Sequence, residues 1–364
     1  MRKVLKYFLV FVPLSFVLAY TKEDSIWTFM TSAAAIVPLA MYMNKYIDRI
    51  ATGLGSALGG LLSVTFGNAT ELIISLFAIR DGLLGVVKAA ITGSIIMNLL
   101  LVLGLSFFLG GLKYRRQSFD KLVAITNSAM LMLAVAGMLL PAIFYFGSPK
   151  IEKLVLGRLS LGVAGVLFLT YLASLYFTMV VHEEEKDSYA QADETNGSET
   201  DGGQEGKHQQ IDRKKLLIEI TVLLFITSLI AMEANFLVSS LENISEMANI
   251  SPVFIGIIVI PIISNVAENY TAISMARQNK INLSINIAIG SSIQVALMLV
   301  PLLIFISHII GSPMNVLFNI LEISSIAMSV LAINVVYLQG KSNWFEGVQL
   351  IAVYLIIAIA FYYA

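Results

Sequence analysis

Apolar stretches of about 20 residues recur along the whole chain, and no other feature limits its fold as strongly. A helix of that length is long enough to cross roughly 30 Å of hydrocarbon. Hydrophobic residues make up 57% of the sequence and charged residues 13%, against roughly 25% charged in soluble domains. The pattern therefore predicts an all-α polytopic membrane protein, in which helices satisfy the backbone polar groups.

The apolar stretches predict about eleven spans, which fall into two groups. The segment 182–215 separates the groups: it is acidic, contains Gly and Ser, and cannot bury a core. We expect a leading helix over 1–20, a first half over 26–181, an acidic linker over 182–215 and a second half over 216–364. The spans are expected near 4–20, 26–44, 57–80, 83–109, 122–146, 154–181, 216–240, 253–276, 283–309, 313–338 and 345–364.

The basic residues predict the orientation in the membrane. With eleven spans, the N-terminus and the even-numbered loops share one side, which receives 17 of the 23 Lys and Arg residues. Cytoplasmic loops carry an excess of Lys and Arg. We therefore expect the N-terminus and the acidic linker in the cytoplasm, the C-terminus outside and the protein in the plasma membrane. The first 20 residues resemble a signal peptide, but this topology favours a helix that is retained.

An internal repeat relates the two halves. Asn68 and Glu71 recur as Asn265 and Glu268, 197 positions later, and Gly93-Ser94 recurs as Gly290-Ser291 at the same offset. The third and eighth spans are an odd number of spans apart, so they cross the membrane in opposite directions. The sequence therefore predicts two inverted five-helix repeats plus one leading helix, an architecture common among secondary transporters.

The repeated motif places carboxylates inside the membrane. A charged side chain there is costly, so an intramembrane glutamate indicates function, and two at equivalent positions argue against a merely structural pair. Gly67, Gly93 and Gly290 are expected to allow close helix approach and local helix breaks. The oxygen donors near the two glutamates are Asn68, Asn98, Asn265, Gln294, Ser94 and Ser291.

An all-oxygen set suits a hard cation such as Ca²⁺ and does not suit soft metals. Two carboxylates balance the charge of one divalent ion. When the ion leaves, like-charge repulsion in a low dielectric favours proton uptake by the glutamates. Competition between Ca²⁺ and protons for the same groups is sufficient for antiport.

Several other functions are disfavoured by composition. The chain has no cysteine and three histidines, and its net charge is −1, so thiolate chemistry is excluded and nucleic acid is not expected as a partner. The spans contain no paired aspartates and no His–Glu zinc motif, which disfavours an intramembrane enzyme. A closed site made by inverted halves gives a channel little support. No cofactor is expected, and a homo-oligomer is left open.

Four segments together carry a family resemblance. They read GNATELIIS over 67–75, GSIIMNLLL over 93–101, GSSIQ over 290–294 and SNWFEG over 342–347. In these segments the chain resembles the calcium/proton exchanger (CAX) branch of the calcium/cation antiporter superfamily. The resemblance implies export of cytoplasmic Ca²⁺ in exchange for H⁺, with Glu71 and Glu268 binding the ion. It also implies that Asn68, Asn98, Asn265 and Gln294 line the site, with Ser94 and Ser291 nearby.

The sodium/calcium exchangers of the same superfamily resemble this chain less. Their repeats usually carry a proline before the acidic residue and further carboxylates on the next helix, where this chain has Asn98 and Gln294. Exchange of Na⁺ for Ca²⁺, or of Mn²⁺ or Mg²⁺ for H⁺, remains the alternative. Two residues depart from the CAX pattern: Asn269 replaces a histidine, and Ser264 replaces a glycine, which is expected to restrict helix approach.

Three further glutamates lie in or near spans. Glu233 and Glu322 could pair with a neighbouring helix or line the ion path, and a structural role is favoured because neither has an acidic counterpart at the repeat offset. For Glu346, near an interface, an anchoring role is favoured over ion contact. The acidic linker keeps two interpretations, a solvated tether or a weak Ca²⁺-attracting regulatory segment.

Overall fold

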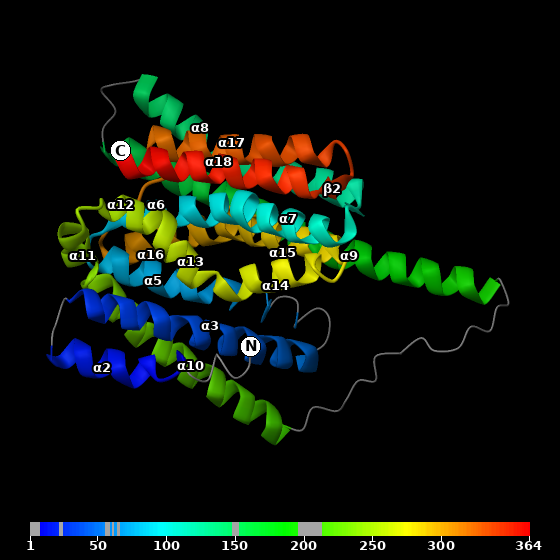
Figure 1. Ribbon diagram of the computed structural model, residues 1–364. Helices are drawn as coiled ribbons and strands as arrows, with labels where there is room; N and C mark the ends of the chain where they lie inside the picture. The colour runs from blue at the N-terminus through cyan, green and yellow to red at the C-terminus, as the bar shows by residue number, and fades with distance from the viewer. Residues whose placement is uncertain are drawn as a thin grey trace.

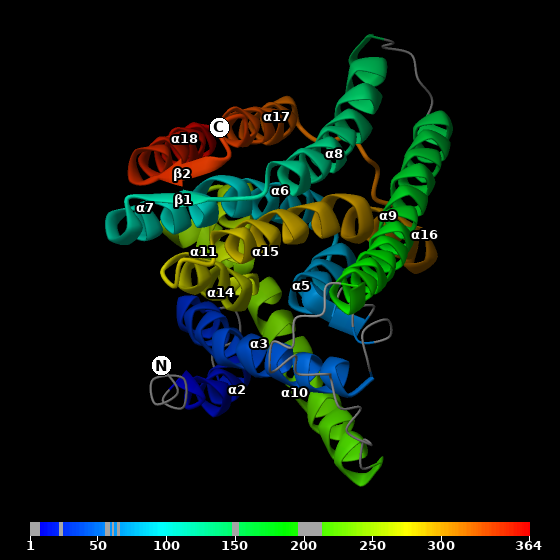
Figure 2. The same cartoon turned by 90° about the vertical axis from the view of Figure 1, so that its right-hand side faces the viewer.

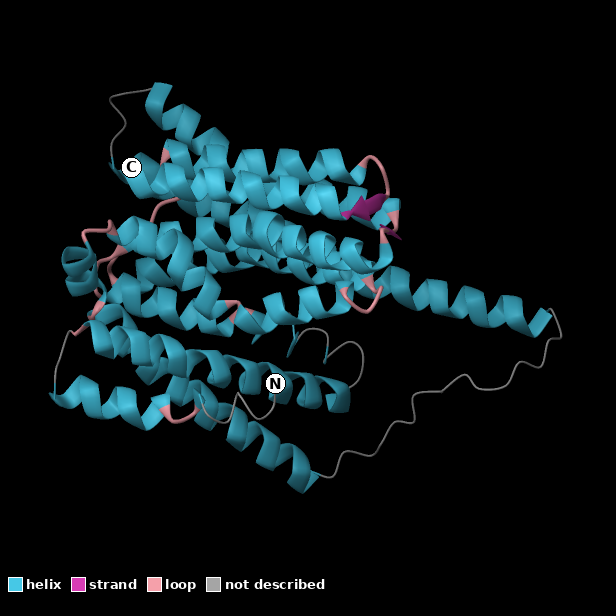
Figure 3. Ribbon diagram, viewed as in Figure 1, coloured by secondary structure: helices cyan, strands magenta, loops and turns pink. Residues whose placement is uncertain are grey.

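The computed structural model describes residues 8–21, 25–54, 59, 62–63, 66–147, 153–195 and 213–364, and nearly all of them are helical (Figures 1 and 3). The first half comprises α2 (Phe11–Thr21), α3 (Ile26–Leu54), α5 (Ala69–Arg80), α6 (Leu84–Ile96), the π-helix η1 (Met97–Val102), α7 (Leu103–Tyr114), α8 (Lys121–Gly147) and α9 (Lys153–Thr195). The second half comprises α10 (Arg213–Ser239), α11 (Leu241–Ala248), α12 (Pro252–Phe254), η2 (Ile255–Val259), α13 (Ile260–Ser264), α14 (Val266–Ala276), α15 (Ile281–Gln294), η3 (Val295–Leu299), α16 (Val300–Ile310), α17 (Ile320–Tyr337) and α18 (Trp344–Tyr363).

The polytopic all-α architecture is confirmed, but the count of eleven spans is not. Within the described residues, eight helices are long and apolar enough to cross a membrane, or nine if the bent pair of Leu241–Ala248 and Pro252–Ser264 is one span. The count differs because α2 has only 11 residues and α5 only 12. The expected span 253–276 is broken at Asn265, and parts of the spans expected near 4–20 and 57–80 lie outside the described residues.

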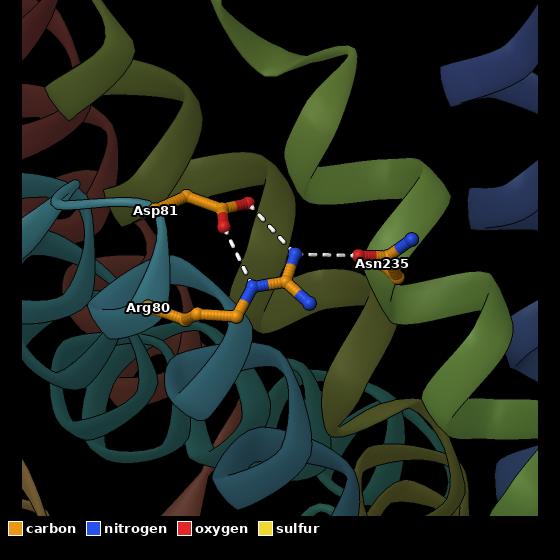
Figure 4. Close-up of polar contacts among 3 residues, drawn as sticks. All are labelled: Arg80, Asp81 and Asn235. Carbon is orange, nitrogen blue, oxygen red and sulfur yellow. Dashed lines mark hydrogen bonds and ion pairs between the residues drawn. The ribbon is translucent and has the colours of Figure 1, made fainter. Parts of the chain in front are cut away.

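The two halves run in opposite directions. The last residue of α5, Arg80, donates a hydrogen bond to Asn235 near the end of α10 (Figure 4). The last residue of α14, Ala276, accepts one from Gln117 of the short strand β1 (Arg116–Ser118). Figure 1 shows α11 at one end of the bundle and the two short strands at the other. The repeat is therefore inverted, as predicted from the odd number of spans between its two motifs.

The helices form layers around a buried centre. In Figures 1 and 2, α2, α3 and α10 lie on one side, while α17 and α18 lie on the other. The continuous units α6–η1–α7 and α15–η3–α16 lie between these layers and are the most buried of the spans. Helices α3 and α10 pack through a hydrophobic cluster of their own, which includes Leu39, Met43, Leu223 and Ile230. Other residues of the same two helices, such as Ile36 and Leu237, pack in the main core, so the outer layer is joined to the rest of the bundle.

Glycines allow two of the closest helix contacts. A Cβ at Gly93 would collide with the Ile257 carbonyl of η2 and would lie 2.7 Å from Cγ of Pro261. A Cβ at Gly347 would similarly collide with the backbone of α7. The close approach expected at Gly93 is therefore present. It is not present at Gly290, where nothing lies within 4 Å, or at Gly67, whose nearest neighbour is a Gln294 oxygen at 3.6 Å.

A small antiparallel β-pair was not expected in an all-α chain. Strand β1 pairs with β2 (Lys341–Asn343), with Arg116 opposite Asn343. The strands follow α7 and precede α18, so they join the ends of two helices that pack closely. In the acidic segment expected to link the halves, α9 continues as a helix to Thr195, and residues 196–212 lie outside the described part.

The three further glutamates make structural contacts. Glu322 and Glu346 complete capping boxes at the starts of α17 and α18, where each accepts a hydrogen bond from the N-cap backbone. Glu233 is fully buried and accepts a 2.6 Å hydrogen bond from Ser15, which joins α10 to α2. These contacts agree with the structural roles expected for all three.

Candidate functional site

Both repeats break their helix at the same asparagine. Asn68 precedes α5 with φ −101° and ψ 24°, and Asn265 precedes α14 with φ −100° and ψ 14°. In each case the asparagine carbonyl accepts the first helical hydrogen bond, from Leu72 at 3.0 Å and from Asn269 at 2.9 Å. The breaks place Glu71 and Glu268 in the first turns of their helices, where the helix dipole favours negative charge. The repeat thus extends to backbone geometry.

Glu71 lies in a closed polar cluster built from both halves. Its Oε1 accepts short hydrogen bonds from Ser94 of α6 and from the Asn265 side-chain amide. That amide also lies 3.2 Å from the Ser94 hydroxyl and 3.3 Å from the Ser264 hydroxyl. Glu71 is 5% exposed, and the space beside it holds only about 10 Å³.

Ser264 does not separate the helices as expected. Its hydroxyl lies 3.3 Å from the Asn265 side-chain amide. Gly93 of α6 still packs closely against Ile257 of η2 and Pro261 of α13. Ser264 therefore adds an oxygen atom to the cluster around Glu71 without opening the helix contact.

Glu268 lies in an open cavity of about 640 Å³. Its Oε1 accepts a 2.5 Å hydrogen bond from the Asn44 side-chain amide of α3. The cavity is lined by α3, by the two helix breaks and by α15. Thus one expected carboxylate is sealed within the bundle, while the other is accessible from one end.

The remaining expected residues form a neutral network beside Glu268. Asn68 donates to the Gln294 side-chain oxygen at 2.9 Å, and Ser291 donates to the Asn68 oxygen at 3.5 Å. Asn98 of η1 donates to the Ser291 hydroxyl at 3.0 Å. Asn68, Ser291 and Gln294 line the same cavity as Glu268. The structure therefore brings all eight expected residues to the centre of the bundle, in the Glu71 cluster, in this network or in the cavity.

The contacts of the two glutamates are not symmetric, although each glutamate follows a repeat-equivalent asparagine by three positions. The repeat counterparts of the Asn265–Glu71 and Ser94–Glu71 hydrogen bonds would join Asn68 and Ser291 to Glu268. Instead, Asn68 contacts Gln294, and Glu268 contacts Asn44. Glu268 is thus held by the outer layer, away from the partners that symmetry would give it.

Sequence reasoning did not identify the residues of α3 that line the cavity. Asn44, Asp48 and Thr52 share the cavity with Glu268. The repeat offset could not reveal Asn44 or Asp48, because the corresponding residues are Leu241 and Ser245. Their four-residue spacing could have identified them from the sequence, since it places them on one face of a helix.

The donor set suits a hard cation. Among the described residues, no group of three or more His, Cys, Asp and Glu side chains is placed to hold a metal. The site instead combines two carboxylates with amide and hydroxyl oxygens, which are the ligands that Ca²⁺ takes in proteins. Such a site lacks the imidazole and thiolate ligands that softer metals prefer.

Comparisons with known proteins agree with this arrangement. The profile of the family described as "Sodium/calcium exchanger protein" matches residues 24–180 and 218–363. A "Ca(2+)/H(+) antiporter" of Aphanothece halophytica is 40% identical over 98% of this chain and 95% of its own length. "Ca(2+)/H(+) antiporter ChaA" of Bacillus subtilis is 37% identical over 96% of both chains.

Solved structures show the same fold. The structure of native YfkE superposes with a TM-score of 0.81 at 34% identity, covering 98% of this chain and all of the other. The H⁺/Ca²⁺ exchanger CAX superposes with a TM-score of 0.68 at 16% identity, over all of this chain and 92% of the other, which supports the fold alone. The chain therefore belongs to the sodium/calcium exchanger protein family, in the branch whose named members are Ca²⁺/H⁺ antiporters.

Proposed function

We propose that this protein is a secondary active antiporter that exports Ca²⁺ in exchange for H⁺. The relatives that carry this name are 37–40% identical to the chain over nearly its whole length. The observation that carries the proposal is the pair Glu71 and Glu268, each in the first turn after an equivalent helix break in oppositely directed halves. The two carboxylates bind Ca²⁺ and protons alternately.

The chemistry of exchange follows from the two environments. Ca²⁺ arriving in the cavity meets Glu268 first, because Glu71 is enclosed. The ion replaces the Asn44 amide as the partner of Glu268, since a divalent cation attracts a carboxylate more strongly than a neutral donor does. Amide and hydroxyl oxygens of Asn68, Asn98, Asn265, Gln294, Ser94 and Ser291 complete the coordination. Once Ca²⁺ has left, protons neutralise the two carboxylates and allow the unloaded site to return.

The direction of transport rests on the predicted orientation. The cavity is lined by Asp48, Arg49 and Thr52 near the C-terminal end of α3. That end of the bundle also carries the basic residues around β1 and β2, including Arg115, Arg116 and Lys341. By the positive-inside rule it faces the cytoplasm of a plasma-membrane protein. The cavity would then receive cytoplasmic Ca²⁺, and the protonmotive force would drive its export.

Transport in inverted membrane vesicles tests the proposed function. Vesicles with an acidic interior and no sodium on either side should accumulate ⁴⁵Ca²⁺, and collapsing the pH gradient with a protonophore should release it. Vesicles from cells without the protein provide the background. Uptake that requires a sodium gradient would replace this proposal with Na⁺/Ca²⁺ exchange, and no uptake of Ca²⁺ under either gradient would contradict both.

A further inference from the structure

Three oxygen-bearing side chains of α3 form a stripe along the cavity. Asn44, Asp48 and Thr52 are each four residues apart on the continuous helix Ile26–Leu54, and all three line the cavity that contains Glu268. Residues at this spacing lie on one helix face, separated by about 6 Å along the axis. The stripe therefore leads from the Asn44–Glu268 contact toward the end of the bundle that carries the two strands (Figure 1).

The polar atoms of the stripe are available to a ligand. The Asn44 amide nitrogen donates to Glu268, while its oxygen is buried and has no hydrogen-bond partner within the described residues. Asp48 is exposed to the cavity, and across the described ranges no hydrogen bond or ion pair engages its carboxylate. The Thr52 hydroxyl donates to the Asp48 backbone carbonyl at 2.7 Å and so retains its acceptor capacity.

Two basic side chains near Asp48 increase the importance of its negative charge for an approaching cation. Lys45 and Arg49 line the same cavity, and the Arg49 guanidinium lies 5.4 Å from the centre of the Tyr46 ring. Without Asp48, an approaching cation would meet two positive charges and no opposing charge on this helix. Charge in a cleft strongly affects the rate at which a charged ligand arrives.

We propose that Asp48 forms a capture site for the hydrated divalent cation, one helical turn outward from the Asn44–Glu268 contact. The site rests on the proposed function and extends it. Asp48 supplies the charge, and Thr52 supplies a neutral oxygen. The free oxygen of Asn44 is the next ligand inward, so that the cation passes from Asp48 to Glu268 along one face of α3.

Asp48→Asn tests this site in inverted vesicles, where the cavity faces the bath. With ⁴⁵Ca²⁺ and a fixed pH gradient, the substitution should raise the KM for Ca²⁺ roughly three- to tenfold and leave the maximal rate within about twofold. In right-side-out vesicles, where Ca²⁺ uptake occurs by transport in the reverse direction, the KM for Ca²⁺ at the opposite face of the membrane should not change. Asp48→Glu should keep the wild-type KM. Asp81→Asn, at the other end of the bundle beside Arg80 (Figure 4), is the matched control and should also keep it.

A double substitution separates cation capture from simple neutralisation of Arg49. If Asp48 binds the cation, Asp48→Asn combined with Arg49→Gln should still have a KM well above that of Arg49→Gln alone. Equal KM values for these two variants, or a wild-type KM for Asp48→Asn, would overturn the capture site while leaving the antiport function intact. Absence of uptake by the wild-type protein would overturn the proposed function, and this inference with it.

Discussion

Asn265 of the second repeat donates a hydrogen bond from its side-chain amide to Glu71 of the first, whereas its counterpart Asn68 donates to Gln294. One carboxylate is therefore held by the opposite repeat, and the other by Asn44 of the outer layer. Because the asparagines and the glutamates are repeat counterparts, we interpret this difference in their contacts as a property of one conformational state. In a conformational state that opens the site to the other side of the membrane, we expect the hydrogen bond from Asn44 to Glu268 to be replaced by hydrogen bonds from Asn68 and Ser291.

Removing the amide that crosses between the repeats should impair transport. Asn265→Ala leaves the buried Glu71 with fewer donors and removes an expected ligand, and losing a hydrogen bond to a buried charged group costs about 1.5–3 kcal/mol. We expect the maximal rate of ⁴⁵Ca²⁺ uptake to fall by at least about tenfold, as that energy implies.

Asn269→Ala provides a control on the same helix. Within the described ranges, the Met97 sulfur at 3.7 Å is the one hydrogen-bond partner of the Asn269 amide, and this interaction is weak. The rate of ⁴⁵Ca²⁺ uptake by the Asn269→Ala variant should stay within about twofold of wild type, because the substitution removes no strong interaction. Equal losses in the two alanine variants, with both proteins folded, would contradict the role given to Asn265.

Proton competition sets the direction of the pH dependence. Raising the pH on the cavity side removes protons that compete with Ca²⁺ for the same carboxylates, so the KM for Ca²⁺ should fall as that pH rises. The change should approach about tenfold per pH unit for each proton displaced. Initial uptake rates measured from pH 6 to 8, with the pH gradient held constant, give this dependence. A KM independent of pH would show that protons bind elsewhere.

Asn269→His should steepen this pH dependence. The substitution restores the residue usual in the CAX pattern, one position after Glu268, and an imidazole becomes positively charged just below neutral pH. The added charge should oppose Ca²⁺ binding at pH 6 and disappear at pH 8, so the KM ratio to wild type should exceed one only at the lower pH. Asn269→Gln, which cannot titrate, should behave as wild type at both values. A constant ratio for the histidine variant would show that position 269 does not influence the site.

Gly93 and Gly290 are repeat counterparts that should respond differently to alanine. A methyl group at Gly93 would collide with the Ile257 backbone, and overpacking of this kind costs about 1–3 kcal/mol or more. At Gly290 nothing lies within 4 Å of the added atom. Thermal unfolding of the purified proteins in detergent should therefore show a lower Tm for Gly93→Ala and an unchanged Tm for Gly290→Ala. Equal shifts would mean that the two contacts do not differ as the structure shows.

The repeat explains why much of the site was predictable from sequence. A constant offset identified Asn68, Glu71, Asn265 and Glu268, and inversion of the halves then required these residues to meet. The helix break expected near Gly67 occurs at Asn68, and its counterpart at Asn265 shortens the expected span 253–276. No break occurs at Gly93 or Gly290, because α6 and α15 run continuously through these residues. The breaks at Asn68 and Asn265 also explain why the spans expected near 57–80 and 253–276 are not counted as single long helices. The span expected near 4–20 is not counted because α2 has 11 residues and residues 1–7 lie outside the described part.

The asymmetric contacts could not be predicted from symmetric motifs. Asn44 contacts Glu268 because α3 of the first half packs against α13 and α14 of the second half. Ser264 similarly looked like an obstacle to helix approach, yet its hydroxyl joins the Glu71 cluster through Asn265. Both outcomes depend on tertiary packing, which a comparison of the two motifs does not contain.

The central claim is that Glu71 and Glu268 bind the transported ions, and isosteric substitution of each tests it most directly. Purified protein in liposomes with an imposed pH gradient would be assayed for ⁴⁵Ca²⁺ uptake and for proton flux with an internal pH dye. Glu71→Gln and Glu268→Gln should each abolish both fluxes, while Glu233→Gln, a buried glutamate bound to Ser15 away from the cavity, should retain them. Coupled Ca²⁺ and proton fluxes in either of the first two variants would contradict the account.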